Sequence, residues 1–371
     1  MFGWALKQVD INNVFPNGDL NEETYMLQPP QILNIIMEIN HWCASLRRRC
    51  MASNRHFGPD HLVASSFVLS KSNFSLFIRQ SSEILLYVPV YVDDIISQEI
   101  ISQLSYFLGI EVTHTASRLF LSQQKYIQDL LQHGKFQRHT YFHDIFLSPI
   151  DNESECMSIV GALQYIVFTR PDIMFAVNRV CQFMHKPIDH HFKVVKHILR
   201  FLQARIDHGV YFTTASRLSL VGYSYASWGN DPDGKRSTSS FCIFIGGNPV
   251  SWGSKKQQVV SRSSVEAEYK SLDHATVDIT WLESLLGELS VQLAGKAALW
   301  CDNSSTVVVS ANLILHSMFK HVTTKKLVVG HVLVQDQVAD VLTKPLSAWC
   351  FTRFKTQFKV VSRLESLQSK R

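Results

Sequence analysis

The feature that most constrains this chain is a pair of adjacent carboxylates, Asp93 and Asp94, set between two β-prone apolar segments. Residues 84–92 supply the first segment and Ile95-Ile96 begin the second, so the pattern predicts a β-hairpin with the carboxylates at its tip. A plain solvated turn is the commoner explanation of such a pair. Asp10 lies in a further β-prone segment, and a third carboxylate on a neighbouring strand would complete a site for two Mg²⁺ ions.

Further blocks of sequence follow one another in a fixed order along most of the chain. Together they resemble the reverse transcriptase and ribonuclease H region of Pol polyproteins from copia-type LTR retrotransposons. The blocks are residues 8–15, 18–20, 25–26, 28–30, 91–96, 106–112, 160–165, 169–173, 176–178, 263–269, 299–303 and 339–345. The resemblance implies an α/β (α+β) chain with an incomplete reverse-transcriptase palm, a helical connection and a ribonuclease H-like domain built on a mixed sheet.

The expected domains follow these blocks. A partial palm spans 1–150, connection helices span 151–215, a ribonuclease H-like domain spans 216–346, and a basic C-terminal tail spans 347–371. Within the palm, residues 31–66 and 133–150 are unlike the family. Because the resemblance begins close to Met1, we expect the chain to lack the fingers that precede the palm in the family.

One of the unlike stretches has a specific explanation. Residues 47–56 read Arg-Arg-Arg-Cys-Met-Ala-Ser-Asn-Arg-His, where the family carries Lys-Lys-Ala-Leu-Tyr-Gly-Leu-Lys-Gln-Ala. A codon string for the family block, read one base later, gives all ten residues of this chain. We therefore interpret the stretch as translated out of the ancestral frame, and not as a basic nucleic-acid patch. A genomic locus without compensating insertions or deletions on either side would contradict this interpretation.

The second half of the chain carries clear secondary-structure patterns. Pro171-Asp172 can begin a helix, and residues 191–202 repeat apolar side chains at helical spacing. Strands are expected at 218–225, 239–245 and 249–252, then a helix after Ser263 with Glu266 completing a capping box. A buried strand at 298–301 and two later helices complete the element order of a ribonuclease H-like fold.

The resemblance assigns the polymerase chemistry to the palm. Asp10, Asp93 and Asp94 would be its catalytic, Mg²⁺-binding residues, and Phe15 would bind the incoming nucleotide beneath its sugar. Without the motif, Phe15 is better explained as a buried strand aromatic. Pro89 lies in the strand that should position Asp93, where proline is poorly tolerated. We expect this and the missing segments to impair the polymerase, because alignment supplies about 7–11 kcal/mol of such a barrier.

The resemblance also assigns a ribonuclease H centre, in which four carboxylates bind two Mg²⁺ ions. Glu268, Asp302 and Asp340 match three of the four as catalytic and metal-binding residues. The family's Ser-Asp-Ala-Asp-Trp block reads Ser-Tyr-Ala-Ser-Trp here, so Tyr225 takes the bridging position. A phenol with a pKa of about 10 cannot replace a carboxylate at neutral pH, so we expect hydrolysis to be lost. On the residues alone, Glu268 would be a solvated helix residue and Asp302 a helix N-cap.

Charge and composition limit the partners only broadly. The net charge of +5 is compatible with a polyanion. Lys255, Lys256 and Arg262 are candidate nucleic-acid-binding residues that could contact hybrid phosphates, and a solvated loop is an equally good explanation. The expected partners are an RNA template, a DNA primer and an RNA–DNA hybrid, with no membrane.

The cysteines and apolar segments address the compartment. The seven cysteines show no metal-ligand spacing, which is typical of reduced thiols in an intracellular protein of the cytoplasm or nucleus. No secretory signal or apolar segment of bilayer length is present, so the chain is expected to be neither secreted nor membrane-spanning.

Three hypotheses follow. An active polymerase predicts Mg²⁺-dependent primer extension that Asp93→Asn abolishes. A non-catalytic nucleic-acid binder, using the basic residues between 179 and 200 and those near Lys255, predicts an affinity that falls steeply with salt. A relic without function, folded from about residue 158 onward, predicts rapid proteolysis of the part before it.

Overall fold

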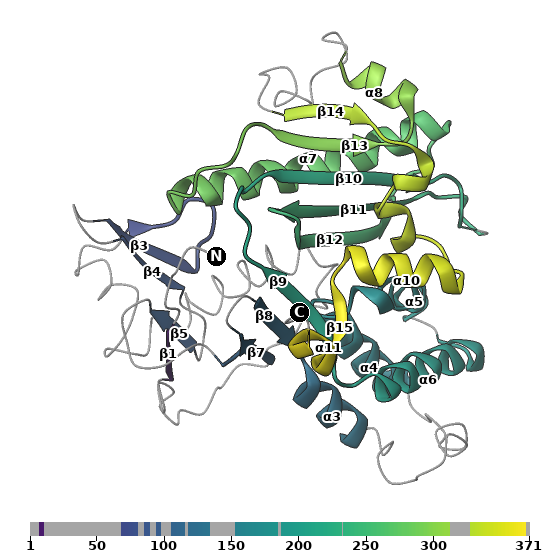
Figure 1. Ribbon diagram of the computed structural model, residues 1–371. Helices are drawn as coiled ribbons and strands as arrows, with labels where there is room; N and C mark the ends of the chain where they lie inside the picture. Colours follow the sequence, from purple (N-terminus) through teal and green to yellow (C-terminus); the bar gives the residue numbers. More distant parts are fainter. Residues whose placement is uncertain are drawn as a thin grey trace, which may run out of the picture. The chain divides into compact units, whose positions relative to one another are not determined.

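The computed structural model describes residues 7–10, 68–80, 85–89, 94–97, 105–115, 118–133, 153–184, 187–231, 233–311 and 327–368. The chain divides into two units (Figure 1). Unit 1 comprises Met1–Leu108 with Trp281–Gln292, and unit 2 comprises Gly109–Thr280 with Leu293–Arg371. Within the described ranges, no helix combines the length and apolar character that a bilayer crossing requires.

Unit 1 contains short strands in the part that was expected to be a palm. They are β1 (Lys7–Asp10), β2 (Val68–Leu69), β3 (Leu76–Gln80), β4 (Leu85–Pro89), β5 (Asp94–Ser97) and β6 (Tyr106–Phe107). An antiparallel sheet has the order β2-β3-β4, and β1 pairs with β5. Pro89 is the last residue of β4, the outer strand of that sheet, where the missing N–H donor is tolerated. Pro89 therefore disturbs this described sheet less than we expected from the sequence.

Unit 2 is built around a five-stranded mixed sheet. Its strands are β10 (Leu220–Ser227), β11 (Thr238–Ile245), β12 (Asn248–Lys256), β13 (Ala297–Cys301) and β14 (Leu327–His331), in the order β12-β11-β10-β13-β14. The first three strands are antiparallel, while β10, β13 and β14 run parallel. The mixed α/β fold class and the four expected strands are confirmed. The sequence analysis missed β14.

Two adjacent residues of β12 show how helices cover both faces of this sheet. Ser251 donates a 3.4 Å hydrogen bond to Asp278 on α7 (Ser264–Glu288). Its neighbour Trp252 donates through Nε1 to the carbonyl of Val167, on the opposite face. Because side chains alternate along a strand, α7 covers one face of the sheet and the helices near Val167 cover the other.

The close approach of α7 to the central strand depends on Gly222. A methyl group at this position would lie only 2.8 Å from the Ile279 side chain of α7. Glycine therefore lets the long helix pack directly onto β10. This packing places the N-terminal half of α7 beside the end of β10, where the candidate site lies.

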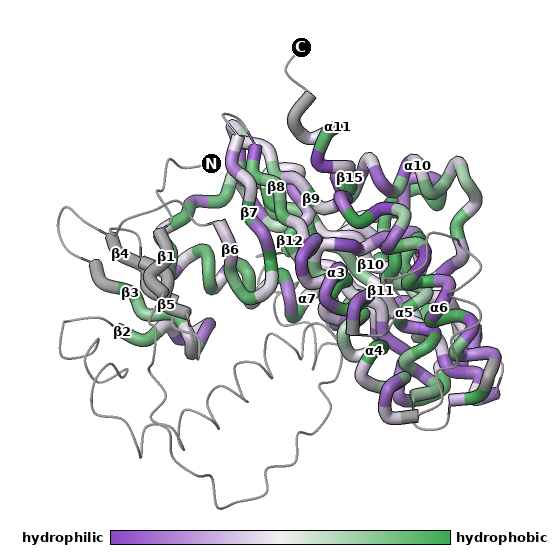
Figure 2. Tube along the Cα trace, turned by 90° about the horizontal axis from the view of Figure 1, so that it is seen from below, coloured by the Kyte–Doolittle hydropathy of each residue, from purple (hydrophilic) through white to green (hydrophobic). Residues whose placement is uncertain are grey.

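The remaining helices flank the sheets. They are α3 (Gln124–His133), α4 (Glu153–Ile166), η2 (Pro171–Ile173), α5 (Met174–Cys181), α6 (Asp189–Ala204), α8 (Ser304–Ser310), η4 (Val334–Asp336), η5 (Ala339–Leu342), α10 (Ala348–Gln357) and α11 (Arg363–Gln368). The expected helices at Pro171 and at 191–202 are confirmed, and hydrophobic and hydrophilic positions alternate along α6 (Figure 2). Lys196, one of the basic residues between 179 and 200 that the hypothesis of a nucleic-acid binder uses, is buried.

A second sheet in unit 2 uses the end of the chain. The antiparallel strands β15 (Val360–Ser362), β9 (His208–Thr213), β8 (Arg118–Ser122) and β7 (Ile110–His114) lie in this order. The Asn248 side chain accepts from Thr213 N–H at 2.8 Å and donates to the Thr213 carbonyl at 2.9 Å. This bidentate bond joins β9 to the start of β12. The region 347–371, expected as a basic tail, thus contributes two helices and a strand.

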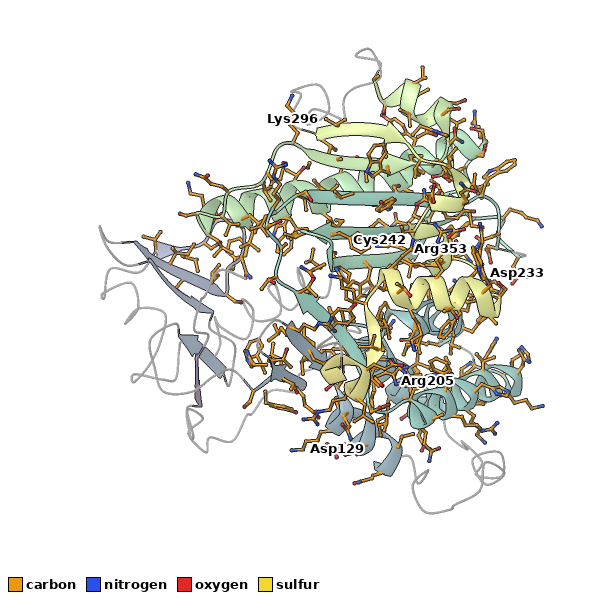
Figure 3. All side chains as sticks on the ribbon, viewed as in Figure 1. Asp129, Arg205, Asp233, Cys242, Lys296 and Arg353 are labelled. Carbon is orange, nitrogen blue, oxygen red and sulfur yellow. The ribbon has the colours of Figure 1, made fainter. Side chains whose placement is uncertain are left out.

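The cysteines that the structure describes are free thiols, as expected: Cys156, Cys181, Cys242, Cys301 and Cys350. Cys242 is fully buried in the middle of β11 (Figure 3). Cys43 and Cys50 lie outside the described residues.

Candidate functional site

The candidate site lies where β10 and β13 end side by side. The parallel register aligns Ser224 of β10 with Cys301 of β13, so Tyr225 and Asp302 follow at the same end of the sheet. Glu268 reaches this point from α7, where its carboxylate accepts a 2.9 Å hydrogen bond from the backbone N–H of Ala226. Only 5% of Glu268 is exposed, so its explanation as a solvated helix residue is wrong.

Asp302 is held at the strand end and does not cap the next helix. The N-cap of α8 is Asn303, whose side chain accepts a 3.1 Å hydrogen bond from Thr306 N–H. The alternative explanation of Asp302 as an N-cap is therefore wrong by one residue. The Asp302 carboxylate instead accepts a long, 3.5 Å hydrogen bond from Gln337. The Asp302 carboxylate therefore lies beside Glu268 at the end of the sheet.

Asp340 enters the site from η5, which is tied to the sheet by two hydrogen bonds. Ser240 on β11 donates to the carbonyl of Ala339 at 2.7 Å, and Gln337 donates to the carbonyl of Ser224 at 2.9 Å. Both donors are buried, so the short helix has a fixed position. The structure thus brings Glu268, Asp302 and Asp340 to one end of the sheet.

Burial dominates the electrostatics of Glu268 and Asp340. It raises the pKa of Glu268 to about 8, and the negative charge of Asp302 adds to the rise. Burial likewise raises the pKa of Asp340. The adjacent Cys301 thiol has a pKa raised to about 12 by burial and by the charge of Glu268. Concentrated negative charge is thus disfavoured here unless a cation compensates it.

Lys344 supplies such a cation, and the sequence analysis did not identify it. Its Nζ forms an ion pair with Asp340 at 3.3 Å and lies 4.5 Å from the centre of the Tyr225 ring. Burial acts to lower the pKa of Lys344, but its hydrogen bond to Tyr225 and the charge of Asp340 raise the pKa overall. Lys344 lies just past the end of η5, in the same sequence block as Asp340, and no helical spacing in the sequence marked it as a partner of that carboxylate.

Tyr225 belongs to the same cluster of charges. Burial raises its pKa, the hydrogen bond from Lys344 opposes this rise, and the charges of Glu268 and Asp302 add to it. A tyrosine of raised pKa is a neutral phenol at physiological pH. The position that would be a fourth carboxylate therefore holds a neutral ring with an ammonium group beside it.

The described residues contain one group that could hold a metal ion. Ligand atoms of Glu268, Cys301 and Asp302 lie within 4.8 Å of one another. Cys301 was not expected among these residues. Two Mg²⁺ ions, however, need hard oxygen ligands on both sides. A phenol at position 225, a thiol at 301 and the Lys344 ammonium do not fit a pair of Mg²⁺ ions.

The basic candidates lie on the strand and loop that lead into α7. Lys256 forms a 2.6 Å ion pair with Asp231, and this bond lowers the pKa of Asp231. Arg262 is exposed, and its backbone N–H donates to Glu266 at 2.8 Å. The expected capping box is half formed, since Ser263 Oγ accepts from Glu266 N–H while the Glu266 carboxylate bonds to Arg262.

The palm residues are only partly described. Asp10 and Asp94 lie directly opposite each other in the antiparallel pairing of β1 with β5. Strands β4 and β5 flank residues 90–93, but β4 pairs with β3 and β5 pairs with β1, so the described strands do not form the hairpin that the sequence predicted. Asp93 and Phe15 lie outside the described residues.

Sequence comparisons place the chain among curated transposon proteins. It is 35% identical to two retrovirus-related Pol polyproteins of Arabidopsis thaliana, from transposons RE1 and RE2, over 96% of this chain and 27% and 28% of those polyproteins. The chain thus spans about a quarter of their length. An uncharacterized mitochondrial protein of Arabidopsis thaliana, AtMg00810, is 35% identical over 53% of this chain and 94% of its own length.

Comparisons with family models and solved structures add little weight. No family model matches the chain. The LC11 ribonuclease H1 in complex with an RNA/DNA hybrid covers 33% of this chain and 93% of its own, at 15% identity and a TM-score of 0.25. A foamy viral protease–reverse transcriptase in complex with double-stranded DNA covers 66% of this chain and 46% of its own, at 13% identity and a TM-score of 0.38.

The blocks in their order, the sheet order of unit 2 and the curated relatives all point the same way. The chain belongs to the retrovirus-related Pol polyproteins of transposons.

Proposed function

We propose that this chain is a copia-type region whose ribonuclease H centre no longer hydrolyses RNA but still binds nucleic acid. The observation that carries the proposal is the pairing of Tyr225 with Lys344 at the position of the missing carboxylate. The exposed Arg262, on the loop before α7, is the kind of group that contacts phosphates, and it supports the binding part of the proposal.

The chemistry of the cluster supports the loss of hydrolysis. Catalysis by two ions requires a carboxylate that bridges them, and Tyr225 offers only a neutral phenol. The Lys344 ammonium already compensates the charge of Asp340 and lowers the pKa of Glu268 against the effect of burial. This centre therefore lacks the groups that hydrolysis by two ions needs. Glu268, Asp302 and Asp340 are assigned only to its ancestral metal site.

A hybrid-cleavage assay tests the proposal. The purified chain is incubated with an RNA–DNA hybrid labelled on the RNA strand, in Mg²⁺ and separately in Mn²⁺. We expect no cleavage by the wild type. The Tyr225→Asp variant restores a fourth carboxylate and shows whether this residue alone disabled the centre. Cleavage by the wild type that Asp302→Asn abolishes would refute the proposal.

The palm is proposed to be an impaired RNA-directed DNA polymerase. Asp10, Asp93 and Asp94 would bind Mg²⁺, and Phe15 would contact the sugar of the nucleotide. The pairing of Asp10 with Asp94 across β1 and β5 supports the shared location of two of these residues. Primer extension on an RNA template, with Asp93→Asn as the matched control, tests this assignment. Extension by the wild type alone would show a working palm.

A further inference from the structure

An exposed tryptophan follows directly after the candidate site. Trp228 comes three residues after Tyr225, at the end of β10, and 54% of it is exposed. Its indole Nε1–H, the only polar group of the side chain, donates a 2.9 Å hydrogen bond to the carbonyl of Ser261. The ring is therefore fixed in place, and what it presents to solvent is apolar. An exposed, oriented aromatic ring of this kind is typical of a binding surface.

The loop that holds the indole, residues 257–263, is itself firmly anchored. Gln257 is buried, and its amide donates to Ser239 and to the carbonyl of Ala267, both at 2.9 Å. The Ser261 hydroxyl donates in turn to Oε1 of the Gln257 side-chain amide at 2.8 Å. These bonds tie the loop to β11 and to α7. The exposed ring therefore rests on a rigid support.

The same loop exposes two further apolar residues. Val259 and Val260 are 59% and 52% exposed, and they immediately precede Ser261. We call Trp228, Val259 and Val260 the platform. An anchored loop that keeps its valines in solvent stabilises the fold little, because the favourable term comes from burial.

Several basic residues lie in or next to the two segments of chain that carry the platform. Lys235, Arg236 and Arg262 are exposed, and Lys255 is half-buried. Two of the nearby carboxylates already have cationic partners, since Asp231 pairs with Lys256 and Glu266 pairs with Lys270. Asp233, in the loop between β10 and β11, is an exposed exception (Figure 3). An anionic partner is therefore favoured over a neutral or basic one.

We infer that the platform binds single-stranded nucleic acid, with Trp228 stacking on an unpaired base and the flanking cations contacting phosphates. Every base has a π-face that can stack on an indole, and basic side chains beside an aromatic ring are the usual composition of such sites. This inference rests on the proposed nucleic-acid function and specifies its substrate: an unpaired strand, next to the former hydrolytic centre.

The test measures binding of a fluorescein-labelled oligothymidylate to the full chain by fluorescence anisotropy, at several salt concentrations. Trp228→Ala is expected to weaken binding roughly 5- to 150-fold at each salt concentration, which corresponds to one stacked base. Its salt dependence stays unchanged, because no phosphate contact is lost. Arg262→Gln is expected to lower both the affinity and the slope of log affinity against log salt, by about 0.7 for one phosphate contact on a single strand.

Two controls make the result specific. Trp349 on α10 is another exposed tryptophan, 70% exposed, and Trp349→Ala should leave the affinity within about twofold of the wild type. Trp228→Phe keeps an aromatic ring but loses the hydrogen bond to Ser261, so it should bind more tightly than Trp228→Ala and less tightly than the wild type. Circular dichroism confirms that each variant is folded.

Three outcomes would overturn the inference. In the first, Trp228→Ala binds the oligonucleotide with the same affinity as the wild type. In the second, Trp228→Ala and Trp349→Ala lose the same amount of affinity. In both cases the proposed nucleic-acid function stands and the platform does not. A wild type that binds neither the oligonucleotide nor an RNA–DNA hybrid would refute both, so the two failures are distinguishable.

Discussion

The block Thr169-Arg170-Pro171-Asp172 contains a buried ion pair whose removal should be costly. Arg170 donates to both oxygens of Asp172, through Nε at 2.9 Å and through Nη2 at 2.8 Å. Neither side chain has any exposed surface. Arg170 also donates to the carbonyl of Arg205 at 2.8 Å, and so fastens the start of η2 to the end of α6. The substitution Asp172→Asn keeps the shape of this side chain and removes its negative charge.

The magnitude follows from the surroundings of Arg170. After the substitution its guanidinium stays buried, and the bond to Arg205 and the Phe201 ring, 5.6 Å away, offer only partial compensation. A second cation, Arg205, lies over the same ring at 4.7 Å. Breaking one side of a buried pair costs about 3–5 kcal/mol. At roughly 2–4 °C per kcal/mol, the melting temperature should fall by about 6–20 °C.

The assay is urea unfolding, followed by both circular dichroism and tryptophan fluorescence so that coincident transitions justify a single free energy. Asp336→Asn is the matched control, because Asp336 pairs with Arg353 at 3.1 Å while 52% of its side chain is exposed. That surface pair should be worth no more than about 1 kcal/mol. A loss below about 1 kcal/mol for Asp172→Asn, or equal losses in the two variants, would refute the reasoning.

Other predictions concern burial and close packing. Burial raises the pKa of Asp278 from 3.8 to about 8, so between these two pH values the folded state binds a proton that the unfolded state does not. The free energy of unfolding should therefore fall as the pH rises from about 4 to 8. Urea unfolding of Asp278→Asn should show a flatter dependence on pH, and an unchanged dependence would contradict this prediction. Gly330→Ala would place a methyl group 2.5 Å from the Trp300 ring and should cost about 1–3 kcal/mol. In α4, a methyl group added at Gly161 would have no neighbouring atom within 4 Å, so Gly161→Ala should instead stabilise the fold by about 0.4–1 kcal/mol. Thermal melts that show both glycine substitutions raising, or both lowering, the melting temperature would contradict this packing.

Much of unit 2 could be predicted because its patterns are local. The β-branched and aromatic runs of β10 and β11, and the turns between them, depend on neighbouring residues only. The helix that begins at η2 was predicted from Pro171, whose φ suits a first turn. By contrast, β14 is a short strand whose partner, β13, lies far away in sequence. Its place in the sheet is set by parallel pairing, which no local pattern reveals.

The family and the fold class could be identified from the amino-acid sequence alone, because ordered blocks and periodic patterns are properties of the residues themselves. The protonation and charge balance of the candidate site, in contrast, depend on the folded chain. It buries Glu268 against Ala226, and it sets Lys344 over the ring of Tyr225. It also holds the Trp228 indole on the loop that ends at Ser261. The physical reason is that burial, pKa and charge compensation depend on distances between residues far apart in the chain.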